Sequence, residues 1–236
     1  MVSKNVEYDL DKSIKWSKET LLDKLTFRPV IEKAIGDVKN KTVLDVGCGS
    51  GRYSALMAKR GANVIGIDIS KYQINLAKQI NSNPKIRYIV GDGSNVPFIP
   101  DNSIDFILMN MVVPSILSKR KLSQTMREMH RILKQNGRLI ISTLHPFFVI
   151  PDSTIDSTIS FNKRHYFNEG HKYKSRAYLS KGGYIKFTET HFSLSYISKA
   201  MMDNGLFIKQ ILESKQSPRF SVYLPKFIIF LAEKYK

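Results

Sequence analysis

Hydrophobic residues along the middle of the chain follow two alternating spacings. Short apolar runs rich in Val and Ile end at turn-forming residues, and after each run apolar residues recur every three or four positions. The first spacing is typical of strands buried on both faces, and the second is typical of helices with one buried face. The pattern predicts strands at 42–46, 63–68, 85–90, 104–110 and 138–144 and helices at 51–60, 70–80 and 118–134.

The two ends of the chain extend this arrangement. Residues 1–40 lack a strand pattern and are predicted to be helical, and a further helix is predicted at 193–204, with Gly205 as its stop. Strands at 207–213 and 226–233 would complete the sheet. Because strands that alternate with helices form parallel sheets, we expect an α/β fold with a doubly wound, mostly parallel, seven-stranded Rossmann-like sheet.

The stretch from about 145 to 191 interrupts the alternation. It is rich in aromatic, histidine and hydroxyl-bearing residues, and it follows the strand at 138–144 at the edge where open α/β sheets bind ligands. Long insertions at such edges often carry function. We interpret it as a cap over a substrate, containing a small β element with its turn at 181–184. A lid that only excludes water is the other interpretation.

The strand at 42–46 leads into a glycine-rich turn that contains Gly47, Gly49 and Gly51, with Asp45 just before it. Glycine lets the backbone pass close to a ligand because it has no Cβ, and the amides that open the next helix attract polar or anionic groups. Asp68 ends the next strand 23 residues beyond Asp45, where a βαβ unit presents a carboxylate to a ribose. These features predict a cofactor that contains a nucleoside.

Two cofactor classes compete for this turn. Nicotinamide and flavin enzymes use G-x-G-x-x-G, whereas the glycines here form G-x-G-x-G after an acid. The turn resembles the first motif of the class I S-adenosylmethionine-dependent methyltransferases, and three later segments resemble further motifs of that family in the same order. They are GDGSNVPF at 91–98, SIDFILMN at 103–110 and LKQNGRLIIS at 133–142, where Gln135 and Asn136 depart from the family's L-K-P-G-G. The resemblance covers about residues 40–145 and implies S-adenosylmethionine as cofactor and S-adenosylhomocysteine as product.

The resemblance also implies roles for individual residues. Asp45 would orient the ammonium group of the cofactor, Asp68 would accept hydrogen bonds from both ribose hydroxyls, and Asp92 would receive the adenine amino group. For Asp45 and Asp92 the structural alternatives are a helix cap and a turn. Asn110 and Met111 would face the transferable methyl. The other residues assigned to the cofactor are Tyr8, Gly47, Cys48, Gly49, Gly51, Ile69 and Gly93.

Methyl transfer from a sulfonium is an in-line displacement with a neutral leaving group, so the enzyme mainly has to align the reactants. A base is needed only when the nucleophile carries a proton of high pKa. His145, directly after the strand at 138–144, is the first candidate, and His191 is the second, although a lone histidine is more often structural. The predicted catalytic residues are His145, His191 and Asn110. The predicted acceptor pocket contains His145, Tyr166, Tyr173 and His191, with Glu189 as a further, unranked candidate.

Composition narrows the possibilities. The 236 residues include 37 Lys and Arg against 20 Asp and Glu, a net charge of +17, but the basic residues are scattered, which favours a solvated basic surface over a nucleic-acid site. The single cysteine, Cys48, excludes an internal disulfide, and no metal site is expected, because His165, Glu169 and His171 lack a recognised ligand spacing. No apolar run is long enough to span a bilayer and the N-terminus has no secretory signal, so a cytoplasmic location is expected.

The sequence therefore predicts S-adenosylmethionine-dependent methyl transfer to an O, N or C nucleophile of a small aromatic or metabolite acceptor. The chain lacks both a pocket cysteine and an N/D-P-P-Y motif, which argues against a nucleic-acid base as acceptor. A tRNA or rRNA methyltransferase that uses the basic surface, a nicotinamide dehydrogenase and a non-catalytic cofactor-binding subunit are the alternatives. The expected organisation is one methyltransferase domain over 1–236, with a helical lid (1–40), a cofactor-binding core (41–145), a cap insertion (146–190) and C-terminal core strands (191–236).

Overall fold

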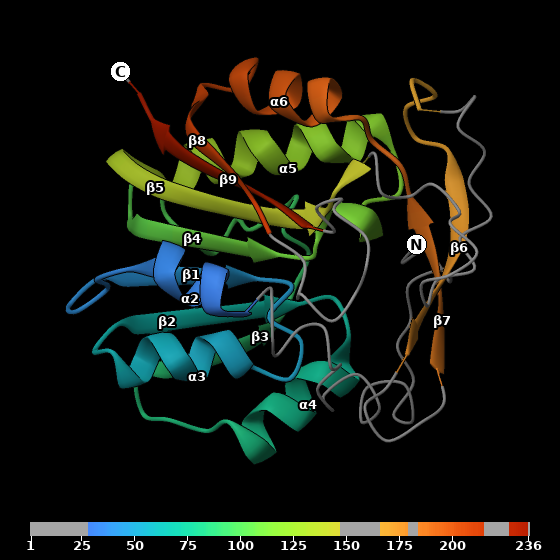
Figure 1. Ribbon diagram of the computed structural model, residues 1–236. Helices are drawn as coiled ribbons and strands as arrows, with labels where there is room; N and C mark the ends of the chain where they lie inside the picture. The colour runs from blue at the N-terminus through green and yellow to red at the C-terminus, as the bar shows by residue number, and fades with distance from the viewer. Residues whose placement is uncertain (1–27, 147–165, 179–183, 215–226, 236) are drawn as a thin grey trace.

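The computed structural model describes residues 28–146, 166–178, 184–214 and 227–235, with a seven-stranded sheet at its centre (Figure 1). The strand order is β3-β2-β1-β4-β5-β9-β8. Neighbours from β3 to β5 are parallel, and β9 is antiparallel to both β5 and β8, so the predicted mostly parallel sheet is confirmed. The strands are β1 (Thr42–Val46), β2 (Asn63–Asp68), β3 (Ile86–Val90), β4 (Ile104–Asn110), β5 (Leu133–Leu144), β8 (Leu206–Glu213) and β9 (Phe227–Lys234).

Helices cover both faces of this sheet. α2 and α3 pack on one face, α5 and α6 pack on the other, and α4 lies against β2 and β3 near the sheet edge. Serine residues begin three of these helices, because Ser70, Ser118 and Ser193 each accept the backbone N–H three residues later through the side-chain oxygen. None of the described helices has the length and apolar composition that a membrane crossing requires. The helices are α2 (Arg28–Ile35), α3 (Arg52–Lys59), α4 (Lys71–Ile80), α5 (Lys119–Ile132) and α6 (Leu194–Met202).

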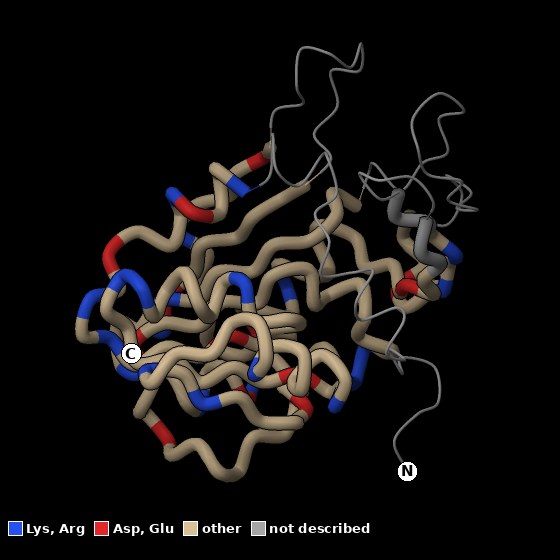
Figure 2. The backbone as a smooth tube through the Cα atoms, turned by 90° about the horizontal axis from the view of Figure 1, so that it is seen from below, with Lys and Arg blue, Asp and Glu red and all other residues tan. Residues whose placement is uncertain are grey.

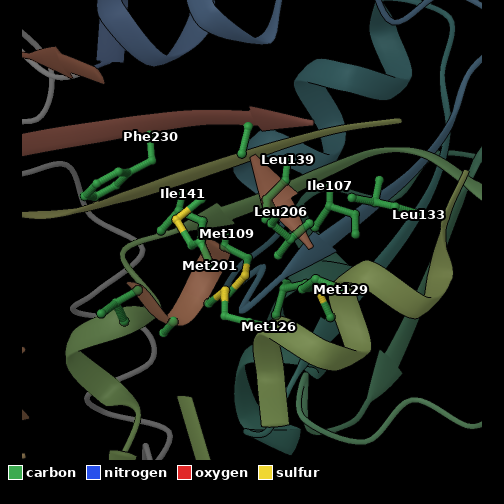
Figure 3. Packing of buried hydrophobic residues seen from close by; sticks show 14 of the residues in the cluster. Ile107, Met109, Met126, Met129, Leu133, Leu139, Ile141, Met201, Leu206 and Phe230 are labelled. Atoms are coloured by element: carbon green, nitrogen blue, oxygen red, sulfur yellow. The ribbon is translucent and has the colours of Figure 1, made fainter. Parts of the chain in front are cut away.

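Methionine side chains fill much of the core between the sheet and α5 (Figure 3). Met126 and Met129 of α5 are fully buried and lie beside strand residues such as Ile107 and Leu139, so the predicted buried face of this helix is confirmed. Flexible, unbranched methionine adapts well to the uneven surface that a twisted sheet presents to a helix.

The end of α5 differs from the prediction. The helix ends at Ile132 rather than at 134, and Leu133 already has extended backbone, with φ −63° and ψ 135°. Leu133 pairs with Ile104 on β4, and the register then shifts before the continuous pairing from Arg138 onward. The strand partner therefore takes Leu133 out of the helix, although its apolar side chain fits the helical spacing.

A separate two-stranded antiparallel sheet is formed by β6 (Lys172–Tyr178) and β7 (Tyr184–Thr190). Figure 1 shows this hairpin beyond the carboxyl ends of the parallel strands. β7 packs against η2 (Val113–Ser115), a 3₁₀ turn that follows β4 and that the sequence pattern did not predict. The predicted β element in the insertion is thus present, while its predicted turn lies largely outside the described residues.

A buried lysine ties the last strand to the rest of the sheet. Lys234 on β9 donates hydrogen bonds from Nζ to Asn102 Oδ1 at 2.7 Å and to the carbonyl oxygens of His130 and Leu133 at 2.8 and 3.0 Å. The ammonium group therefore holds β9 at the junction between α5 and β5, and its desolvation is offset by three oxygen acceptors.

The core packing gives a direct prediction. Met126→Ala should lower the free energy of unfolding by about 2–5 kcal/mol, because it removes a fully buried side chain and leaves a cavity in a dense core. Urea denaturation monitored by circular dichroism measures this. The neighbouring exposed residue is the control, and Arg127→Ala should change the same free energy by less than about 0.5 kcal/mol. Equal effects of the two substitutions would contradict the buried position of Met126.

Candidate cofactor and acceptor site

The turn after β1 has three glycines in the left-handed region, where residues with a Cβ are strained. Gly47, Gly49 and Gly51 have φ values of 64°, 54° and 83°. A Cβ on Gly47 would lie 2.6 Å from Val112 Cγ2, and one on Gly51 would clash with the Tyr88 hydroxyl.

Gly49 differs from its two neighbours in the turn. Among the described residues, a Cβ on Gly49 would meet only Gln73 Oε1, at 3.9 Å. Neighbouring protein atoms therefore explain two of the three glycines, whereas at Gly49 the positive φ alone favours glycine.

Asp45, on β1, is buried, with 2% of its surface exposed. Ser54 Oγ on α3 donates a hydrogen bond to Asp45 Oδ2 at 2.5 Å. Burial raises the pKa of Asp45 to about 7, against the opposing effect of the Ser54 hydrogen bond, and the nearby Asp68 raises it further. A cation placed beside such a buried acid would stabilise its ionised form and lower its pKa.

Asp68, at the end of β2, links two turns. Its Oδ2 accepts the backbone N–H of Gly49 at 2.9 Å, and its Oδ1 accepts the N–H of Ser70 at 2.8 Å. Burial raises the pKa of Asp68, and these two hydrogen bonds oppose the increase. Because each carboxylate oxygen has two lone pairs, each still has capacity for one more donor. The carboxylate is thus fixed in direction and can accept two neighbouring hydroxyls.

Asp92 follows β3 in the Gly-Asp-Gly segment and pairs with a lysine. Lys121 Nζ on α5 lies 2.6 Å from Asp92 Oδ2, and Ser94 donates both its N–H and its hydroxyl to Oδ1 at 2.9 Å. Burial works against the charged form, but the Lys121 and Ser94 hydrogen bonds outweigh it and lower the pKa of Asp92. Gly93 lies against β1, where a Cβ would come within 2.6 Å of Val46 Cγ1.

The end of β4 lies between the glycine turn and β5. Asn110 Oδ1 accepts a hydrogen bond from Ser142 Oγ at 2.7 Å, and Met111 has an unusual φ of 59°. The Met111 N–H donates to the Ser142 carbonyl at 2.9 Å, so β5 holds both residues. A positive φ at a residue other than glycine is costly and is concentrated at functional sites.

Two further residues assigned to the cofactor are Cys48, within the glycine turn, and Ile69, directly after Asp68. The Cys48 N–H donates to the Ile67 carbonyl at 2.9 Å, and burial raises the pKa of its thiol, so this cysteine is a poor nucleophile. Ile69 follows Asp68 and is 43% exposed, and Phe98 is also an exposed apolar residue, at 42%. Exposed apolar side chains at a ligand-binding sheet edge are suited to contact a flat ring.

Both candidate histidines already have partners. His145 Nε2 lies 3.0 Å from Glu213 Oε1, just beyond the end of β5. His191 is buried, its Nε2 lies 2.8 Å from the Tyr166 carbonyl oxygen, and burial lowers its pKa. The Glu213 carboxylate orients the ring of His145, whereas His191 fixes the backbone before β6.

The aromatic candidates lie at different places in the insertion. Tyr173, on β6, is buried and its phenol is close to Glu189. Tyr166 precedes β6, and its ring contacts His191, with 5.6 Å between ring centroids. Tyr8 lies outside the described residues. Among the described residues, no group of three or more His, Cys, Asp or Glu side chains is arranged to hold a metal ion.

Comparison with known proteins assigns this geometry to a family. Residues 44–141 match the model of a methyltransferase domain. The solved S-adenosylmethionine-dependent methyltransferase of Mesorhizobium loti has the same fold, with a TM-score of 0.70 and 19% identity over 95% of this chain and 100% of that one. Residues 44–141 of this chain form a methyltransferase domain. The resemblance inferred from the four motifs is confirmed, and S-adenosylmethionine is the cofactor that the family implies.

Two curated relatives align with the methyltransferase domain. The biotin biosynthesis bifunctional protein BioHC of Cellvibrio japonicus is 38% identical over 44% of this chain and 20% of its own length. The demethylmenaquinone methyltransferase of Renibacterium salmoninarum is 31% identical over 52% of this chain and 49% of its own. The chain thus spans half or less of the length of these relatives.

The structure adds residues to this domain that the sequence interpretation missed. Ser54 is the hydrogen-bond donor to Asp45, and its position in the helix after the glycine turn is a detectable signal. Lys121 pairs with Asp92, but in the sequence it was only one of three consecutive basic residues. Gln73 is buried beside the turn, and neither polar atom of its side chain has a hydrogen-bond partner within the described residues.

The pKa of Asp45 predicts how stability depends on pH. An unfolded aspartate releases its proton near pH 4, whereas folded Asp45 keeps it until about pH 7. The folded state therefore binds more protons between these values, and its stability falls as the pH rises through this window, by at most about 1.4 kcal/mol per pH unit.

Asp45→Asn should remove this contribution, so that the variant gains stability relative to wild type as the pH rises from about 4.5 to about 7.5. Urea unfolding at intervals across that range measures the difference. Asp101→Asn, which removes a largely exposed carboxylate paired with Arg131, is the control for the loss of one carboxylate. An Asp45→Asn curve that runs parallel to wild type would show that Asp45 has an ordinary pKa.

Proposed function

We propose that the protein transfers the methyl group of S-adenosylmethionine to an O, N or C nucleophile of a small-molecule acceptor. The observation that carries this proposal is the Asp68 carboxylate, which the Gly49 and Ser70 amides hold at the carboxyl edge of β2. A fixed carboxylate beside a glycine turn suits a ribose with two free hydroxyls. The proposed methyl transfer is also supported by the match of residues 44–141 to the methyltransferase domain model.

The remaining parts of the cofactor would find chemically matched groups along the same edge. Asp45 would lie near the ammonium group, because a cation offsets the cost of its buried charge. The adenine ring would lie between the exposed apolar side chains of Ile69 and Phe98, with Asp92 accepting from its amino group. Lys121 would keep Asp92 ionised and in place for that hydrogen bond.

The bound cofactor supplies an electrophilic methyl group on a positively charged sulfur. The residues of this chain then have to hold the acceptor in line with that methyl group and keep water out, and alignment of this kind accounts for roughly 7–11 kcal/mol in well-oriented systems. Asn110 and Met111 would border the methyl group, because the Ser142 contacts fix both at the end of β4. No acid is needed, since the leaving group is neutral.

His145 is the favoured candidate for a base when the acceptor carries a proton of high pKa. It follows β5 at the carboxyl edge of the sheet, and Glu213 orients its ring. In His191 the Nε2 atom is occupied by the Tyr166 carbonyl, so this residue would act by holding the loop before β6. Both assignments are part of the proposal.

The small-molecule acceptor is supported by the relatives, whose names refer to demethylmenaquinone and to biotin biosynthesis. A tRNA or rRNA acceptor would instead use the net charge of +17. Figure 2 shows Lys and Arg on many separate segments of the described chain rather than on a single helix or strand. This distribution favours a generally basic surface, and RNA retention that falls steeply with added salt would favour the alternative.

Calorimetric titration with S-adenosylhomocysteine, beside NADH, tests the proposed function. Wild type should bind S-adenosylhomocysteine and should not bind NADH. Asp68→Ala should bind S-adenosylhomocysteine at least about tenfold more weakly, because two hydrogen bonds to a charged group are lost. Asp101→Ala, on an exposed loop, serves as the control and should bind like wild type. Binding of NADH alone would contradict the proposal.

Proton release on binding tests the place of Asp45. Near pH 6 free Asp45 is mostly protonated, and an adjacent ammonium group should lower its pKa, so S-adenosylhomocysteine should displace about one proton. Calorimetry in buffers of different ionisation enthalpy counts the protons released. Asp45→Asn should release none. Equal proton release from wild type and variant would place the ammonium group elsewhere.

A further inference from the structure

The hairpin formed by β6 and β7 has a buried face and an exposed face. Along β6 the buried residues Tyr173 and Ser175 alternate with the exposed residues Lys172 and Lys174. This alternation is the normal result of strand geometry, in which successive side chains point to opposite faces. The hairpin therefore turns aromatic and hydroxyl groups inward and lysines outward.

An acid lies on the buried face of this hairpin. Glu189 on β7 is directly opposite Tyr173, and Phe187 is directly opposite Ser175. Opposed residues in an antiparallel pair share one face, so these four side chains form one surface, with a carboxylate among two aromatic rings and a hydroxyl.

The Glu189 carboxylate is only half satisfied. The Ser175 and Tyr173 side chains donate hydrogen bonds to it. Its Oε2 atom is nevertheless buried and has no hydrogen-bond partner within the described residues. A buried carboxylate oxygen without a donor costs more than a typical hydrogen bond contributes, so native structures rarely keep one without a role.

The hairpin that carries Glu189 lies close to the end of β4. β7 packs against η2, which directly follows the end of β4 with Asn110 and Met111. Figure 1 shows the hairpin standing beyond the carboxyl ends of the parallel strands, on the side of the sheet where the cofactor turns lie. β7, the strand that carries Glu189, is therefore next to the segment proposed to border the transferable methyl.

We propose that Glu189 Oε2 binds the methyl acceptor by accepting a hydrogen bond from an O–H or N–H group of that molecule. The Ser175 and Tyr173 side chains already donate to this carboxyl group, so its oxygens act as acceptors here and the missing partner of Oε2 is a further donor. The rings of Tyr173 and Phe187 on the same surface suit an acceptor whose donor group is attached to an aromatic ring. This role rests on the proposed methyl transfer and names the chemical class of its substrate.

The pKa directions agree with this role. Burial raises the pKa of Glu189, against the opposing effect of the Ser175 and Tyr173 hydrogen bonds, which makes its carboxylate a stronger hydrogen-bond acceptor than an exposed one. Burial also raises the pKa of Tyr173, and the Glu189 charge raises it further, so the phenol remains a donor to the carboxylate.

Three small probes of similar size test the proposal: phenol, benzylamine and toluene, which has no donor. Each is titrated by ligand-observed NMR against the full chain saturated with S-adenosylhomocysteine. Phenol or benzylamine should bind at least tenfold more tightly than toluene, and the preferred probe tells a hydroxyl donor from a cationic one. Glu189→Gln should reduce this preference below threefold, whereas Thr188→Ala, at an exposed position of the same strand, should keep it.

Equal binding of the three probes to wild type would overturn the proposal, and so would a preference that survives in Glu189→Gln. The wild-type comparison needs no substitution and remains decisive if the Glu189 variant does not fold. Calorimetry with S-adenosylhomocysteine on the same samples separates this result from the proposed function. If wild type does not bind S-adenosylhomocysteine, the proposed methyl transfer is contradicted. If it binds S-adenosylhomocysteine but shows no preference for probes that carry a donor, only the proposed role of Glu189 is contradicted.

Discussion

One carboxylate fixes the geometry of the whole cofactor edge. Asp68 accepts a backbone N–H from the turn after β1 and another from the turn that leads into α4, so two crossover connections share a single side chain. The parallel pairing of β1 with β2 brings these turns together, and the hydrogen bonds then set their relative position. Glycines are flexible, and the turn has three of them at positive φ, so the hydrogen bond from Gly49 to Asp68 is needed to restrict the turn to one conformation.

The acids along this edge are tuned in opposite directions by their surroundings. Asp45 and Asp68 are desolvated, and only neutral donors contact them in the described residues, so both resist ionisation. Asp92 has the Lys121 ammonium beside it and ionises readily. A positively charged ligand group is thus favoured beside Asp45 on β1. Beside Asp92, which follows β3, a neutral hydrogen-bond donor is sufficient, because Lys121 already supplies the positive charge. This ordering matches an amino acid part at one end and a nucleobase at the other.

Local sequence determined the alternating core, because each strand there is buried on both faces and each helix has one apolar stripe. The acids and glycines of the cofactor edge were also readable, since backbone constraints select their residue types. The partners of those acids were less accessible. Lys121 and Asp92 are 29 residues apart and meet only through the packing of α5. Leu133 has the helical spacing but is in a strand, because it pairs with Ile104 on β4. The acceptor side depends on strand register in the insertion, and a one-residue shift would exchange its two faces.

The β6–β7 hairpin shares no strand ladder with the central sheet in the part of the chain that the structure describes. It joins the rest through η2 and through the short connection to α6, where Glu169 accepts hydrogen bonds from Ser193. Substitutions on its buried face therefore leave the hydrogen bonding of the sheet intact. During divergence such a module can be remodelled or exchanged between lineages while the cofactor edge stays fixed, so new acceptors can be acquired without rebuilding the domain that carries the methyl donor.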